Sequence, residues 1–225
     1  MSMRDEDFEL FIEEFGEATH TDKVPESSIQ KYNKILPDQL LHYWKTEGWS
    51  AYANGLLWTV NPEDYNDLVD QWLENTHYPK IDKYHCIART SFGVLYVWGE
   101  NNNQWFTISC PTSVIVAFDK KLLKPNKNPD SSIRSFFASA SPKGRDLKNL
   151  KGNMLTPLSF KKLGHLKPNE VYGFAPALAA GGSPVIENIE KEDLFIHLSI
   201  LREMAPPTLP YSDVDINALI KEQEK

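Results

Sequence analysis

The sequence predicts an α+β fold: N-terminal helices packed on an antiparallel β meander, followed by a smaller, mainly helical domain with a short strand. Three features of the hydrophobic pattern lead to this expectation. Apolar residues recur at helical spacing over residues 1–75, follow strand-like runs over 84–118, and return to helical spacing after residue 130. The chain of 225 residues is 41% hydrophobic, enough to bury a sizeable core, which excludes a disordered protein.

The first helix is predicted from one apolar stripe. Its residues stand at i, i+3, i+4 and i+7, namely Phe8, Phe11, Ile12 and Phe15. Gly16 follows as a stop, and acidic residues crowd the first turn, where they stabilise the positive end of the helix dipole.

Two more helices are expected over residues 25–35 and 37–47, before a short buried strand at 56–60. Asn61 then provides an N-cap with Pro62 at the first helical position, so a further helix should run to Leu73.

From residue 84 the pattern changes to strands. Runs rich in β-branched and aromatic residues, separated by turn residues, lie at 85–90, 94–98, 104–108 and 113–118. One face of this meander must pack on the preceding helices.

The polar, proline-punctuated stretch 125–129 is the expected linker between a first domain at 1–124 and a second at 130–205. The second domain should contain helices from 130 and from 156, a strand at 171–175 and a last helix at 190–204. That last helix should point Leu194, His197, Leu198 and Leu201 inward. Residues 206–225 form a tail, and the part from Tyr211 is expected to be frayed or a short surface helix.

The net charge of −7 conceals a separation of charge along the chain. Residues 1–75 carry a net −11, residues 76–167 a net +10, and residues 168–225 a net −6. The acidic blocks could attract a basic partner, or the blocks could be solvated faces that neutralise one another.

Composition and motifs favour a cytoplasmic protein without a cofactor, metal or catalytic centre. No secretory signal or membrane-spanning run is expected. Cys86 and Cys110 are too few for a disulfide framework and are expected as reduced, buried thiols. The six histidines are scattered, and no nucleophile elbow, phosphate loop or zinc motif is present.

One stretch in the second domain carries a family resemblance. Glu170-Val171-Tyr172-Gly173-Phe174, the following Pro176-Ala177-Leu178 and the pair Gly181-Gly182 resemble the C-terminal domain of immunity proteins against type VI secretion DNase effectors. Residues 5–120 resemble the GAD-like domain of the same family. The resemblance rests there on Leu36-Pro37, Gly48-Trp49, Gly55 to Trp58, Asn61-Pro62 and the β meander.

The resemblance implies an antitoxin, not an enzyme, that binds a cognate DNase toxin and blocks it by protein–protein occlusion. Because DNases grip phosphates with basic clefts, an acidic surface suits this role. The candidate contacts are Asp5, Glu6, Asp7, Glu9, Glu13, Glu14, Glu63, Asp64, Asp67 and Asp70, with Tyr172 and Phe174 as possible aromatic anchors. Tyr172 and Phe174 have a second interpretation as core residues, since aromatic side chains in strands usually pack inward.

Two other functions stay open. A nucleic-acid-associated accessory protein would use the basic block 76–167, with a stripe at Lys143, Arg145, Lys148, Lys151, Lys161, Lys162 and Lys167. Its binding would fall steeply with salt, but no binding module or stacking platform favours it. An enzyme or small-molecule binder would instead need titratable groups that converge in a pocket between the two domains. Neither the oligomeric state nor the identity of the toxin follows from the sequence.

Overall fold

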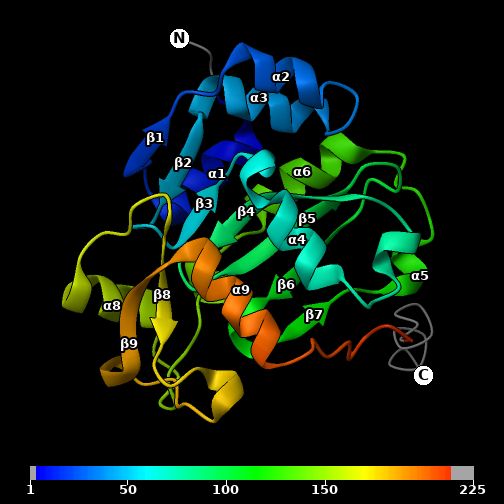
Figure 1. The fold of residues 1–225 in the computed structure, drawn as a ribbon. Helices are drawn as coiled ribbons and strands as arrows, with labels where there is room; N and C mark the ends of the chain where they lie inside the picture. Colours follow the sequence, from blue (N-terminus) through cyan, green and yellow to red (C-terminus); the bar gives the residue numbers. More distant parts are fainter. Residues whose placement is uncertain (1–3, 214–225) are drawn as a thin grey trace, which may run out of the picture.

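The computed structural model describes residues 4–213. Its helices are α1 (Glu6–Phe15), α2 (Glu26–Tyr32), α3 (Asp38–Glu47), α4 (Asn66–Leu73), α5 (Asp119–Leu122), α6 (Pro129–Ala138), α7 (Pro142–Arg145), α8 (Leu155–Leu163) and α9 (Leu194–Met204), and the 3₁₀ helix η1 (Pro62–Tyr65) precedes α4. Its strands are β1 (His20–Asp22), β2 (Trp49–Tyr52), β3 (Leu57–Thr59), β4 (Tyr84–Thr90), β5 (Val94–Gly99), β6 (Trp105–Ser109), β7 (Val114–Val116), β8 (Glu170–Phe174) and β9 (Ile189–Asp193). Strands β1 to β7 form one antiparallel sheet in sequence order, and β8 pairs with β9 in a second, two-stranded sheet (Figure 1). The predicted α+β class is confirmed.

Helix ends follow the capping residues of the sequence. The Asp5 carboxylate accepts the N–H of Phe8 at 2.8 Å, and Gly16, with a φ of 76°, ends α1. Asp193 caps α9 in the same way by accepting two N–H groups of its first turn at 3.1 Å. Local chemistry therefore fixes where these helices begin and end.

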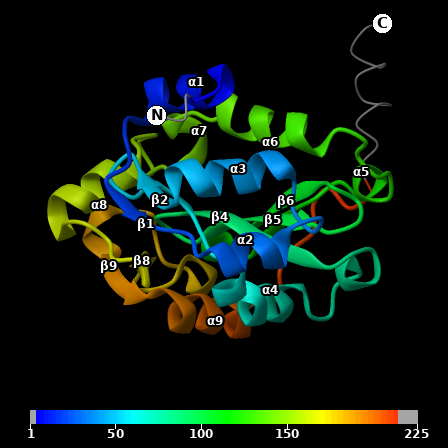
Figure 2. The same cartoon turned by 90° about the horizontal axis from the view of Figure 1, so that it is seen from above.

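The large sheet is the middle layer of three (Figure 2). Helices α1, α3 and α6 lie on one side of it, and α4 and α9 lie on the other (Figure 2). Because helices cover both faces of the sheet, successive side chains of a central strand must pack in different cores. In β5, Leu95 and Val97 belong to one core, and Tyr96 and Trp98 belong to the other. Both faces of the sheet are thus buried at its centre.

The C-terminal segment contributes to both covering layers. Helix α6 packs on α1, with the rings of Phe137 and Phe8 centred 5.1 Å apart, and Asp130 accepts the backbone N–H of Gln39. Strands β8 and β9 and helix α9 pack on the opposite face. The stretch 125–129 therefore does not separate two cores, and the domain boundary expected there stays a proposal.

Arg89 on β4 is the polar link between the sheet and the C-terminal segment. Its side chain is 0% exposed, and its guanidinium lies 4.5 Å from the centre of the Trp58 ring. Nε donates to the Tyr65 hydroxyl at 3.0 Å, Nη1 to the Thr90 carbonyl, and Nη2 to the Pro168 carbonyl at 2.9 Å. No carboxylate among residues 4–213 forms an ion pair with it. Neutral acceptors and one aromatic face therefore compensate this buried charge.

Two parts of the structure differ from the sequence predictions. The helix predicted from residue 190 begins at Leu194, because residues 189–193 pair with β8 as strand β9. Strands β1 and β2, at the edge of the large sheet, were not predicted. After α9, Thr208 exchanges backbone hydrogen bonds with Ser113 and Ile115 beside β7. The part of the tail prediction that concerns residues 214–225 lies outside the described residues.

Replacing Arg89 should destabilise the protein strongly. Arg89→Ala removes the cation–π contact and leaves the Tyr65 hydroxyl and the Pro168 carbonyl without their donor, so we expect a loss of about 3 kcal/mol or more in the free energy of unfolding. Urea unfolding measures it, with the exposed Arg134→Ala as the control that should cost less than about 0.5 kcal/mol. Equal losses in the two variants would contradict this role of Arg89.

A second prediction concerns pH. Burial raises the pKa of Asp146, which accepts from the backbone N–H and the hydroxyl of Thr156, to about 6. Its ordinary value is 3.8, so between these two values the folded protein holds a proton that the unfolded chain has released. Stability from this group is present at low pH and is lost as the pH rises through about 6.

Urea unfolding at pH 4.5 and pH 7 tests the Asp146 contribution. The wild type should lose about 2 kcal/mol more than Asp146→Asn over this interval, because the asparagine does not titrate. Asp38→Asn, at an exposed position, should keep the wild-type pH dependence. An Asp146→Asn profile parallel to the wild type would refute the assignment.

Candidate partner-binding site

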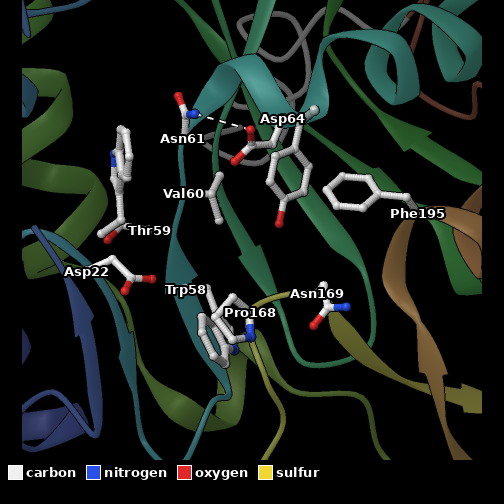
Figure 3. Close-up of a pocket in the computed structure, with 11 residues that line it drawn as sticks. Asp22, Trp58, Thr59, Val60, Asn61, Asp64, Pro168, Asn169 and Phe195 are labelled. Atoms are coloured by element: carbon white, nitrogen blue, oxygen red, sulfur yellow. Dashed lines mark hydrogen bonds between the residues drawn. The ribbon is translucent and has the colours of Figure 1, made fainter. Parts of the chain in front are cut away.

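A cavity of about 150 Å³ lies where the N-terminal and C-terminal segments meet. It is bounded by Asp22 at the end of β1, by the stretch from Trp58 to Tyr65, by the loop Pro168-Asn169 and by Phe195 on α9 (Figure 3). The position of the loop follows from Arg89, which binds the Pro168 carbonyl. The Asn169 carbonyl in turn accepts the N–H of Leu194, so this loop is bonded to the first turn of α9, next to Phe195.

Aromatic side chains and carboxylates share the walls of this cavity. The aromatic residues are Trp49, Trp58, Tyr65 and Phe195. Figure 3 shows the Asp22 and Asp64 carboxylates on different sides of the space and the Phe195 ring facing into it. Tyr65 and Phe195 meet edge to face with their centres 5.2 Å apart.

Each carboxylate in the cavity makes one hydrogen bond within the protein. One oxygen of Asp22 lies 2.9 Å from Nε2 of His20, and one oxygen of Asp64 accepts from the Asn61 amide at 3.3 Å. Partial burial raises the pKa of Asp64 above its ordinary value. The second oxygen of each carboxylate therefore has no donor among the described residues.

The residues that line the cavity do not pair a nucleophile with a base. The lining includes no serine, cysteine, histidine or lysine. Cys86 and Cys110 lie elsewhere, free and fully buried. Burial raises the pKa of the Cys86 thiol to about 12 and raises the pKa of the Cys110 thiol well above its ordinary value. These thiols are therefore not reactive thiolates in this structure.

An acidic and apolar surface lies beside the cavity, on the outer side of the layer that α4 and α9 form. Its acidic part consists of exposed side chains on η1, on α4, just after α4 and on α9: Asp64, Asp67, Asp70, Glu74 and Glu203. Its apolar part is an exposed row on α9: Ile196, Ile200 and Met204. We call it the α4–α9 face. The apolar residues stand at i, i+4 and i+8, so they form one row along the helix, and they are 62%, 46% and 53% exposed.

The two helices of this face are held together by side-chain contacts. Arg202 donates to the backbone carbonyls of Gln71 and Glu74, and the Trp72 indole donates to the Leu198 carbonyl at 3.1 Å. The inward side of α9 buries Leu198 and, with it, Leu194 and Leu201, as the sequence predicts. The outward apolar row was missed, although its spacing of four residues was visible in the sequence.

The structure divides the predicted acidic contacts into two groups on opposite sides of the sheet. Glu63, Asp64, Asp67 and Asp70 lie with α4, whereas the other acids lie on or beside α1: Asp5, Glu6, Asp7, Glu9, Glu13 and Glu14. A partner docked flat on one side of the sheet would therefore contact only one of the two groups.

Two of these acids already serve the fold. Asp5 caps α1 and accepts from the Tyr43 hydroxyl and the Gln39 amide, and Glu63 pairs with Lys31. As contacts, all ten acids stay predictions.

Tyr172 and Phe174 lie in the core. Tyr172 is 1% exposed and donates its hydroxyl to the Gly164 carbonyl at 2.7 Å, and Phe174 is 5% exposed and stacks on Phe92 with ring centres 5.3 Å apart. The glycines between and after them permit close packing. A Cβ on Gly173 would lie 2.7 Å from the His197 ring. These positions favour the core interpretation of the two aromatic residues.

The basic stripe is only partly available to a ligand. Lys162 donates to the carbonyls of Ile186 and Ile189, and the Arg145 guanidinium stacks on the rings of Tyr96 and Phe136 at 4.4 and 4.6 Å. Both cations therefore act within the fold, whereas the other lysines of the stripe are exposed.

Within residues 4–213, no helix is long and apolar enough to cross a membrane. Over the same range, no group of three histidine, cysteine or acidic side chains is arranged to hold a metal ion.

Comparison with known proteins gives two family matches and a likeness to solved structures. Residues 6–112 match the GAD-like domain, and residues 130–205 match the C-terminal domain of the type VI secretion system (T6SS) immunity protein Tdi1. The structure is similar to the crystal structure of Atu4351 from Agrobacterium tumefaciens, with a TM-score of 0.80 and 20% identity over 93% of this chain and 94% of that one. At that identity the likeness concerns the fold. No curated protein matches the chain in sequence.

The Gly181-Gly182 pair yields a stability prediction. A Cβ on Gly182 would lie 1.9 Å from the Pro176 carbonyl oxygen, a clash with rigid backbone, so Gly182→Ala should cost about 2 kcal/mol or more in the free energy of unfolding. Gly181 has a φ of +87° but open space around it, so Gly181→Ala should cost only about 1 kcal/mol. Urea unfolding compares the two, and a smaller cost at Gly182 than at Gly181 would argue against close packing.

Proposed function

We propose that this chain, in which residues 6–112 match the GAD-like domain and residues 130–205 match the C-terminal domain of the T6SS immunity protein Tdi1, binds a DNase effector and neutralises it. The family match supports a T6SS immunity role. To this role we add the class of effector that is bound, the surface of this protein that binds it and the mode of inhibition. The protein acts by occlusion, without turnover, in the cytoplasm where the DNA under attack lies.

The α4–α9 face is the observation that carries the proposal. It combines the two components of a strong protein interface, an apolar centre that can be buried and charges around it. Burying Ile196, Ile200 and Met204 against a partner would contribute a few kcal/mol in total, because full burial of such a side chain is worth roughly 1.5–3 kcal/mol and each is already about half buried. The surrounding acids would steer a basic partner and accelerate association by about 10- to 1000-fold at low salt.

A DNase offers the matching surface. An enzyme that grips a phosphate backbone needs a cleft lined by lysine and arginine, and an acidic protein can fill that cleft in place of DNA. The acids of the α4–α9 face would meet these side chains, and the α9 row would contact apolar surface beside them.

The acids on α1 are the alternative contact group. Their helix also exposes Leu10, which is 49% accessible, but one leucine offers much less apolar area than the row on α9. Helix α9 also lies within the segment that matches the Tdi1 immunity domain, whereas α1 lies in the GAD-like segment. We therefore assign the main contact to the α4–α9 face.

Isolation of the tagged protein from its native cells, with identification of the co-purifying protein, tests the function. The expected partner is a DNase whose cleavage of plasmid DNA stops at a one-to-one ratio with this protein. A partner whose nuclease activity is unaffected would refute the proposal. Recovery of nucleic acid alone, in a salt-dependent way, would favour the basic block instead.

Two matched variants test the surface. Ile200→Asp places a charge in the apolar row and should weaken binding of the identified DNase at least tenfold, about 1.4 kcal/mol, because the carboxylate would lose its hydration in the interface. Leu10→Asp makes the same chemical change on α1 and should leave the affinity within about twofold. Isothermal titration calorimetry measures both, and the reverse order of effects would assign the interface to α1.

A further inference from the structure

The cavity at the edge of the α4–α9 face is too small for a nucleotide or a typical cofactor. Its volume is about 150 Å³, whereas pockets for such ligands span roughly 300–1,000 Å³. A space of this size holds a group about as large as benzene. A single side-chain head group is therefore the appropriate size of occupant.

The walls of the cavity select the charge of that occupant. Asp22 and Asp64 each present an oxygen without a donor from the described residues, and they lie on different sides of the space (Figure 3). Arg89 is the nearby positive charge, but it lies against the Trp58 ring and donates to Tyr65 and to two backbone carbonyls. The carboxylates outnumber it two to one, so a cation with several N–H donors is favoured.

The aromatic side chains select the shape of the occupant. Trp49, Trp58, Tyr65 and Phe195 surround the space, and a planar guanidinium can stack on such rings while its edges donate to carboxylates. An ammonium can approach the same rings but cannot make two parallel hydrogen bonds to one carboxylate.

We infer that this cavity receives an arginine side chain of the effector, an inference that rests on the function proposed above. The occupant would be an anchor residue at the margin of the interface, held by Asp22 and Asp64 and covered by Phe195. An arginine bound here would be withdrawn from the phosphate-gripping surface of the DNase. Partial burial, which raises the pKa of Asp64, is consistent with a carboxylate that gains from a cation beside it.

The direct test needs no effector. Titration of the ¹⁵N-labelled protein with N-acetyl-arginine amide should shift the indole signals of Trp49 and Trp58 in a saturable way, with a dissociation constant of about 1–10 mM. The citrulline analogue has the same shape without the charge and should bind at least tenfold more weakly. Equal shifts with both compounds, or no saturable shift with arginine amide, would overturn the inference.

A matched pair of variants locates the site. Asp64→Asn should weaken arginine amide binding at least fivefold, whereas Asp67→Asn, which removes the same charge from the same surface outside the cavity, should change it less than twofold. Equal effects would mean that surface charge alone attracts the probe, and the inference would fail.

The same variants separate this inference from the proposed function. If the DNase binds the wild type, but Asp64→Asn and Asp67→Asn weaken its binding equally, the immunity function stands and the inference of an arginine in the cavity is refuted. If arginine amide binds through Asp64 but no DNase binds the protein, the cavity is a basic-ligand site and the immunity function fails.

Discussion

Burial of the Arg89 guanidinium is the interaction on which the described arrangement depends. A fully buried cation without a carboxylate partner is tolerated only where hydrogen bonds and aromatic faces replace water. Here the Tyr65 hydroxyl, the Pro168 carbonyl and the Trp58 ring do so, and Pro168 lies about a hundred residues beyond the other two in the chain. The guanidinium thereby positions the loop at 168–169, the start of α9 and the cavity between them.

The glycine and aromatic signature of the C-terminal segment completes this arrangement from the other side. Gly173 and Gly182 allow close contacts that a methyl group would prevent, while Tyr172 and Phe174 are buried. The signature thus holds β8 and α9 against the sheet, and it leaves the outer side of α9 free. This division explains how a segment can match an immunity family through its core while an exposed row of different residues makes the proposed contact.

The sequence predicted those elements whose signals are local. Helix α1, the meander from β4 to β7 and the inward side of α9 all follow from the spacing of apolar residues and from the turn residues between them. Strand β9 did not, because Glu190, Lys191 and Glu192 favour a helix and only the pairing with β8 makes them a strand. The short polar strand β1 was not predicted for the same reason, because its pairing with β2, and not its own sequence, makes it a strand.

The candidate site could be predicted only in part. Three of the acids on it, Asp64, Asp67 and Asp70, were proposed from charge, yet the separation of the acids into two groups depends on which side of the sheet each helix covers. The cavity depends on residues from 22 to 195 in the chain, so no local motif could reveal it.

Hydrogen–deuterium exchange of the protein with and without its DNase partner tests the central claim most directly. We expect slower amide exchange in the complex over residues 66–73 and 194–204, and an unchanged exchange rate in α1. Protection confined to residues 6–15, with α4 and α9 exchanging as in the free protein, would contradict it.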